Sequence, residues 1–192
     1  THEAAWPPMP RKQVVPRDAR DLAIIGDGRG AGRTSAWCSA ARACQAADPA
    51  ACFRAGPVHF AHHLPADLPI GRDPAQRLRM AVVDLAKNSG KTATTHFHVL
   101  AQSEQGVLVR CILETGRTHQ IRVHMASLQL PLVGDSLYGG SAEPLMPRQA
   151  LHAEQLAFEH PITAEKLSFQ SALPPDFQDL LKAWSLSYNE KA

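Results

Sequence analysis

The residues between positions 114 and 124 bring side chains capable of chemistry together at close spacing. Behind Gly116 stand two arginines, two histidines, a threonine and a glutamine, namely Arg117, Arg122, His119, His124, Thr118 and Gln120. A guanidinium stays charged at any working pH and holds a carboxylate or a phosphate through two parallel hydrogen bonds. Such a mixture is poor core material, so the stretch indicates a site, although an isolated surface arginine usually does no more than stay hydrated.

The two histidines of this stretch allow a second interpretation, a metal site. His119 and His124 are five residues apart, but no cysteine or carboxylate completes a ligand set. The incomplete set favours a hydrogen-bonding role. A further histidine cluster, His59, His62 and His63, stands in a part of the chain without periodic pattern, and we interpret it as solvated.

Two hairpins are expected downstream of position 66. Apolar and polar residues alternate over 94–101 and 107–113, which predicts an antiparallel hairpin that ends directly before the polar stretch. A second hairpin is expected from residues 150–159 and 166–172. Strands therefore lie on both sides of the residues that could do chemistry.

Helices are expected between and after these hairpins. Thr118 is the expected N-cap of a short helix, and Pro131 ends it. The apolar residues of this helix recur at helical spacing and are Ile121, Met125 and Leu128. Pro174 and Pro175 open a terminal helix with an apolar stripe. Hairpins and helices in this order predict an α+β domain.

Length and composition limit the remaining possibilities. The chain has 192 residues and a formal net charge of +2, so it fits one domain, and any surface for a polyanion must be local. No apolar run approaches the length of a membrane helix, and no secretory signal is seen, so we expect a cytoplasmic protein with no membrane partner. The four cysteines have no paired spacing and are expected to be reduced thiols.

Residues 1–65 differ in composition from the rest, being rich in alanine, arginine, proline and glycine. Four glycines within 23–32 favour a loop, and the alanine-rich stretch 35–51 predicts a modest helix without an apolar stripe. We expect 1–65 to be weakly specified and partly disordered, and 66–192 to form the folded part. The bias and the absence of methionine at position 1 suggest a frame-shifted or misassembled reading of a GC-rich gene.

Several ordered motifs carry a resemblance to a known family. The motif Gly-Arg-Thr-His-Gln-Ile-Arg-Val-His-Met at 116–125 is followed by Pro-Leu-Val-Gly-Asp at 131–135 and by Tyr-Gly-Gly at 138–140. Supporting segments in the same order are residues 69–73, 90–95, 151–153 and 173–177. Over residues 66–188 the chain resembles the RluA-type RNA pseudouridine synthases.

This resemblance implies an isomerase that detaches uracil from its ribose, turns it and rejoins it through carbon, with no cofactor and no metal. It implies a mixed, mostly antiparallel sheet flanked by helices, with the active cleft across its middle. The implied partner is RNA, and for this family ribosomal RNA is expected, with the target uridine flipped out of the stack. Arg122 is then expected to pair with a catalytic aspartate. The residues expected to contact RNA are Arg117, Thr118, His119, Gln120 and His124.

One expected motif is not found. The family places its aspartate in a His-Arg-Leu-Asp motif, and a tyrosine one motif later; neither occurs upstream of position 69, where the aspartates are Asp18, Asp21, Asp27 and Asp48. Asp135 is expected to cap or brace its loop and not to act as nucleophile. The sequence therefore leaves two functions open, a pseudouridine synthase or an inactive RNA-binding relative. It also predicts an incomplete sheet with an exposed edge.

Overall fold

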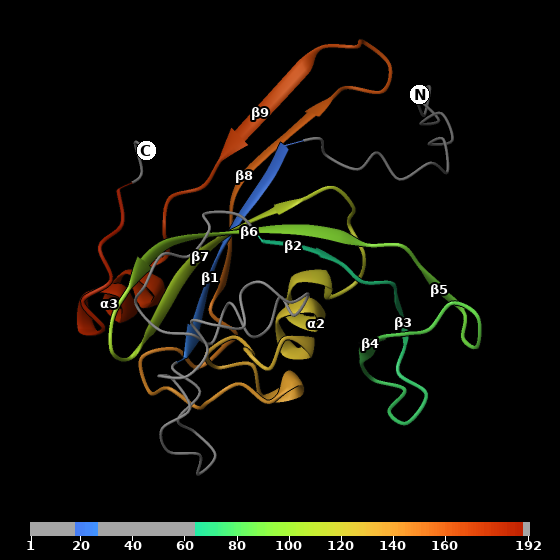
Figure 1. Ribbon diagram of the computed structural model, residues 1–192. Helices are drawn as coiled ribbons and strands as arrows, with labels where there is room; N and C mark the ends of the chain where they lie inside the picture. Colours follow the sequence, from blue (N-terminus) through green and yellow to red (C-terminus); the bar gives the residue numbers. More distant parts are fainter. Residues whose placement is uncertain (1–17, 27–63, 190–192) are drawn as a thin grey trace, which may run out of the picture.

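The computed structural model describes residues 18–26 and 64–189 (Figure 1). Six strands form the main sheet in the spatial order β2-β6-β7-β1-β8-β9. Their bounds are Asp18–Gly26 (β1), Leu64–Asp67 (β2), Thr94–Gln102 (β6), Gly106–Leu113 (β7), Leu151–Glu159 (β8) and Lys166–Gln170 (β9). All five neighbouring pairs are antiparallel. The α+β class and both expected hairpins are confirmed, while a mixed sheet is not seen in the described part.

A smaller antiparallel sheet lies beside the main one, in the order β4-β3-β5 (Figure 1). It consists of Ile70–Arg72 (β3), Met80–Val82 (β4) and Gly90–Lys91 (β5). Gly71 pairs directly with Gly90 across this sheet. A methyl group on Gly71 would come within 2.4 Å of the Ser89 carbonyl oxygen, so the absence of a side chain lets these strands approach.

Strand β1 corrects the expectation of a loop for residues 23–26, because Asp18–Gly26 forms a central strand of the main sheet; residues 27–32 lie outside the described part of the chain. It pairs with β7 on one side and with β8 on the other. The run Leu22 to Ile25 is buried on both faces, as expected for a central strand, and the glycine count had hidden this short apolar run. Among the described residues, the edge strands of this sheet are β2 and β9. The helix expected at 35–51 and the histidines 59–63 lie outside the described residues.

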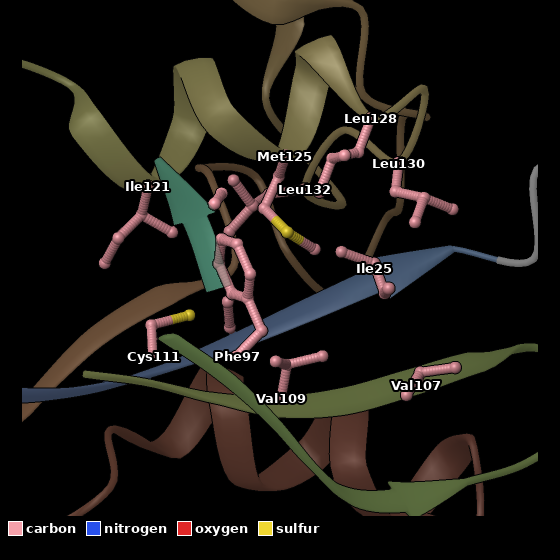
Figure 2. Packing of buried hydrophobic residues seen from close by; sticks show 12 residues of the cluster. Ile25, Phe97, Val107, Val109, Cys111, Ile121, Met125, Leu128, Leu130 and Leu132 are labelled. Carbon is pink, nitrogen blue, oxygen red and sulfur yellow. The ribbon is translucent and has the colours of Figure 1, made fainter. Parts of the chain in front are cut away.

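Opposite faces of β1 carry two separate cores. Ala23 and Ile25 point to the face covered by helix α2 (Gln120–Ser127), where they pack with Met125 and the other residues drawn in Figure 2. Leu22 and Ile24 point to the other face and join the cluster of helix α3 (Pro175–Ala183). Alternation along one strand thus ties both helices to the sheet.

Both expected helices are confirmed, but the start of α2 differs from the expectation. Its N-cap is His119 and not Thr118, and His119 has a left-handed backbone with φ 57° and no capping side-chain bond. Helix α3 begins at Pro175, as the sequence predicts, because proline at the first position lacks only a donor that the helix would leave unused.

Candidate functional site

Gln120 fixes the polar loop before α2 to the sheet. Its Nε2 donates to the Thr94 carbonyl oxygen (3.0 Å) and to Thr95 Oγ1 (2.9 Å). Its Oε1 accepts from Thr115 Oγ1 (2.8 Å) and from the backbone N–H of Arg117 (2.9 Å). The side chain is buried and its hydrogen-bonding capacity is filled. Gln120 therefore positions Arg117 and has no atom to offer RNA, which corrects the expectation of a direct contact.

His124 is also part of the framework. It is fully buried, its Nε2 lies 3.0 Å from the Leu68 carbonyl oxygen, and its Nδ1 lies 2.9 Å from Thr95 Oγ1. A carbonyl only accepts, so Nε2 carries the proton and Nδ1 accepts from the threonine hydroxyl. Burial lowers the pKa of His124, which agrees with this neutral form. The expected RNA contact of His124 is not available in this structure.

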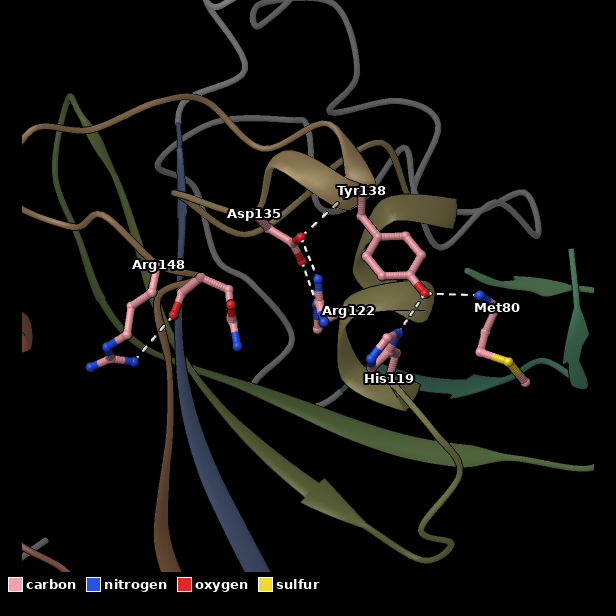
Figure 3. Close-up of polar contacts among 7 residues, drawn as sticks. Met80, His119, Arg122, Asp135, Tyr138 and Arg148 are labelled. Carbon is pink, nitrogen blue, oxygen red and sulfur yellow. Dashed lines mark hydrogen bonds and ion pairs between the residues drawn. The ribbon is translucent and has the colours of Figure 1, made fainter. Parts of the chain in front are cut away.

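Arg122 binds the carboxylate of Asp135, whereas the resemblance implied a pair with a catalytic aspartate. Nε donates to Oδ2 and Nη2 to Oδ1, both at 2.7 Å (Figure 3). The side chains are 13% and 0% exposed, so the pair is largely removed from water. The hydrogen bonds to Asp135 raise the pKa of Arg122 above its usual value.

Asp135 also braces its loop, and this confirms the role expected for it. Its Oδ1 accepts from the backbone N–H of Tyr138, which ends the short 3-10 helix η3 (Ser136–Tyr138). The preceding Gly134 has φ 72°, and a methyl group there would come within 2.1 Å of the Arg148 carbonyl oxygen. The glycine thus permits a tight turn that brings the carboxylate under Arg122.

Tyr138 joins this pair to His119 and to the smaller sheet. The Arg122 guanidinium carbon lies 4.8 Å from the centre of the Tyr138 ring, a cation–π contact. The Tyr138 hydroxyl accepts from the Met80 N–H (3.0 Å) and lies 2.9 Å from His119 Nδ1 (Figure 3). Burial, followed by the charge of Arg122, lowers the pKa of His119. A neutral His119 accepts a hydrogen bond from the Tyr138 hydroxyl at Nδ1, and its protonated Nε2 can donate to another group.

The two remaining expected RNA-binding residues lie at a cleft. Arg117 and Thr118 line a cavity of about 300 Å³ between the loop before α2 and the smaller sheet. Thr118 is exposed, and Arg117 Nε donates to the Thr92 carbonyl oxygen (3.1 Å). These residues remain available to a ligand, in contrast to the buried pair Gln120 and His124.

Asp21 is a carboxylate whose setting the sequence did not reveal. It lies on β1 opposite Cys111 and Ala153, with the same orientation as Ala23 and Ile25, so it faces the α2 side of the sheet. Burial raises its pKa to about 6. A buried carboxylate with a raised pKa is a functional candidate. An alternation count along 18–26 would have found it, had the strand been recognised.

The described part of the chain contains no group of three or more histidine, cysteine or acidic residues arranged to hold a metal ion. In the same part, no helix is long and apolar enough to cross a membrane.

Sequence comparison identifies relatives of this region. A family model described as RNA pseudouridylate synthase matches residues 60–127. Ribosomal large subunit pseudouridine synthase D of Nitrosomonas europaea is 48% identical over 125 residues, which cover 61% of this chain and 35% of that protein. The RNA pseudouridine synthase YlyB of Bacillus subtilis is 48% identical over 116 residues, covering 60% and 37%. The chain thus spans little more than a third of the length of these relatives.

Solved structures extend the comparison to the fold. Human RNA Pseudouridylate Synthase Domain Containing 1 superposes with a TM-score of 0.55 at 20% identity, covering 88% of this chain and 65% of that one. Human RNA Pseudouridylate Synthase Domain Containing 4 gives a TM-score of 0.55 at 20% identity, covering 89% and 63%. The resemblance that the motifs predict is confirmed: in its C-terminal part, this chain is similar in sequence to RNA pseudouridine synthases and shares their fold.

Proposed function

We propose that this chain converts uridine to pseudouridine in RNA, with ribosomal RNA as its substrate and the cytoplasm as its location. In this isomerisation the bond from the ribose C1′ to N1 of uracil breaks and a bond from C1′ to C5 forms. The proton on C5 is released, and N1 gains one. Relatives named as ribosomal large subunit pseudouridine synthases support the choice of RNA.

The observation that carries the proposal is the arrangement around Arg122. A guanidinium has five N–H donors, and Asp135 takes two of them. The described residues give no partner to the other donors, which leaves one edge for a second anion. Asp135 binds one edge of the group, and the ring of Tyr138 packs against it, so both hold it in place. Such a prepositioned cation stabilises negative charge without having to reorganise during the reaction.

The reaction also needs a carboxylate of its own, and Asp21 is our candidate. Both oxygens of Asp135 already accept from Arg122, so Asp135 is poorly placed to attack a substrate. Asp21 accepts no hydrogen bond from the described residues and lies on the sheet face that α2 covers. With a pKa of about 6 it is largely ionised at pH 7. Its chemistry therefore suits a nucleophile at neutral pH.

A tritium-release assay tests the function. Ribosomal RNA labelled with tritium at C5 of uridine loses the label to water when pseudouridine forms. We expect release with the natural chain, none with Arg122→Met, and undiminished release with Lys182→Gln, a change at an exposed residue of α3. RNA binding without release by the natural chain would instead favour an inactive RNA-binding protein, and the absence of both would refute the proposal.

A further inference from the structure

The cleft beside Arg117 has walls from four separate segments of the chain. We call it the basic cleft; it is lined by Ile70, Gly71, Arg72, Met80, Ser89, Gly90, Lys91, Gly116, Arg117 and Thr118. The first seven belong to the smaller sheet and its turn, and the last three belong to the loop before α2. A cavity of about 300 Å³ is at the lower end of the size of ligand pockets.

The charges of the basic cleft are all positive. Arg72, Lys91 and Arg117 line it, and none of its ten lining residues is acidic. No ion pair joins any of the three to a carboxylate of the described residues, whereas the neighbouring Asp73 is paired with Arg79. The whole chain has a formal charge of only +2, so this is a local concentration of charge. Cations crowded without an anion repel one another, and an anionic ligand relieves that repulsion.

Two of these cations are held in place by backbone oxygens. Arg117 Nε donates to the Thr92 carbonyl oxygen at 3.1 Å, and Gln120 holds the Arg117 backbone N–H. Arg72 Nη1 donates to the Arg77 carbonyl oxygen at 3.3 Å. Freely solvated arginines lack such restraints. Because folding already restrains these two side chains, binding a ligand costs less of their conformational entropy.

The basic cleft adjoins the Arg122 site through Met80. Met80 lines the cleft, and its backbone N–H donates to the hydroxyl of Tyr138, whose ring packs on Arg122. The smaller sheet lies beside α2 in Figure 1. A strand held in the cleft therefore lies next to the proposed reaction site.

We propose that the basic cleft binds backbone phosphate of the RNA strand next to the target uridine. The inference rests on the proposed function and extends it to Arg72 and Lys91, which lie in the supporting segments 69–73 and 90–95 but were not among the residues expected to contact RNA. A guanidinium group can bind two phosphate oxygens at once, and Ser89 and Thr118, which also line the cleft, carry hydroxyl donors. The cleft thereby positions the strand without reading its bases.

Two variants of equal charge test this site. The cleft variant Arg72→Gln/Lys91→Gln/Arg117→Gln and the control variant Arg20→Gln/Lys166→Gln/Lys182→Gln each remove three positive charges, the latter from exposed residues. Binding of a uridine-containing ribosomal RNA fragment is measured against salt concentration. We expect the cleft variant to bind about tenfold more weakly at 0.15 M salt, with a log–log salt slope smaller by about 0.7 for each phosphate that the protein no longer neutralises. The control variant should keep most of the affinity and slope. Circular dichroism spectra and urea unfolding verify that both variants fold.

A neutral linkage identifies the phosphate. Oligonucleotides carrying one methylphosphonate at successive positions around the uridine are bound to the natural chain and to the cleft variant. We expect a methylphosphonate at one or two positions to weaken binding by the natural chain and to leave binding by the cleft variant unchanged. Inorganic phosphate in excess has no position along the RNA, so we expect it to lower binding of all oligonucleotides alike. The cleft proposal would be overturned if the cleft and control variants lost affinity equally, or if no methylphosphonate position weakened binding. Tritium release by the natural chain would still support the proposed enzymatic function in that case. A natural chain that neither binds RNA nor releases tritium would overturn both.

Discussion

Replacing Asp135 by asparagine tests the arrangement on which the site depends. The substitution keeps the size of the side chain but turns one of the two acceptors at 2.7 Å from Arg122 into an N–H donor. Removing one partner of a buried ion pair costs about 3 to 5 kcal/mol, because the other charge remains buried without compensation. We expect about 3 kcal/mol, the lower end of that range, since 13% of the Arg122 side chain stays exposed. Urea unfolding at pH 7 measures this decrease in stability.

The chain offers a matched control for this substitution. Arg148 donates to both oxygens of Asp176 at 2.8 and 2.9 Å, the same bidentate geometry, but the two side chains are 38% and 29% exposed. Asp176→Asn should therefore cost less than about 1 kcal/mol. Equal decreases in stability for Asp135→Asn and Asp176→Asn would refute the reasoning, because burial would then not determine the strength of the pair.

A double variant separates the two causes of the destabilisation. Arg122→Met/Asp135→Leu removes both charges, so no buried charge is left unpaired, and apolar replacements of such pairs are often nearly neutral. We expect it to be more stable than Asp135→Asn and yet to release no tritium from labelled RNA. Activity in the double variant would contradict the role proposed for Arg122, whatever its stability.

Three further outcomes follow from burial and backbone geometry. Burial lowers the pKa of His124, so the unfolded chain binds its proton first, and the contribution of this group to stability should be constant above about pH 6.5 and fall below it by up to about 1.4 kcal/mol per pH unit. Urea unfolding from pH 5 to 8 would measure this in the Asp21→Asn variant, because Asp21 contributes the opposite slope below about pH 6; a flat profile in that variant would contradict the buried neutral ring. The pH dependence of stability that Asp21 contributes has the opposite sign, because a carboxyl group whose pKa is raised to about 6 lowers stability as pH rises from about 4. Asp21→Asn should therefore stabilise the fold at pH 7 by no more than about 3 kcal/mol and abolish tritium release. A destabilised but active variant would exclude Asp21 as nucleophile. Gly134→Ala should lower stability by more than about 2 kcal/mol, because the added methyl group clashes with the Arg148 carbonyl and φ is 72°. Gly139→Ala, where φ is 85° but the space is open, should lower stability by only about 1 kcal/mol. Thermal unfolding compares the two variants, and equal losses would show that the clash at Gly134 is relieved.

Elements with a regular period were predictable from the sequence. The hairpin of β6 and β7 follows from alternation, and α2 follows from Ile121, Met125 and Leu128 at helical spacing. Pro175 marks the start of α3 within one residue. In each case the local pattern and the final packing agree, so local reasoning was sufficient.

Other features depended on tertiary contacts. β1 was missed because its apolar run is short and ends at Gly26, where a strand, a buried helix segment and a loop have similar patterns. β1 is identified as a strand by its pairing with β7 and β8, whose paired residues are at least 80 and more than 120 positions away in the sequence. Thr118 has good capping chemistry, yet the bonds of Gln120 to β6 place the first turn one residue later, at His119.

The polar residues of the loop and helix around 117–124 divide according to the direction in which they point. Gln120 and His124 are four residues apart, one turn of helix, so both face β6, where each bonds to Thr95. Arg122 lies between them on another side of α2, next to Asp135. Composition cannot separate these roles, because both groups consist of residues that sites also use.

This division determines how substitutions in the motif are to be interpreted. Gln120→Leu or His124→Leu leaves partners in the core unsatisfied and should lower stability by about 1 to 3 kcal/mol for each group left without a hydrogen bond. Reduced activity in such a variant would measure loss of the fold. Arg117→Gln removes a charge from an accessible cleft and should change RNA affinity and its salt dependence while stability is nearly kept. Only the second kind of variant reports on recognition, so a map of the RNA surface has to be built from Arg72, Lys91 and Arg117, whose charges have no acidic partner among the described residues.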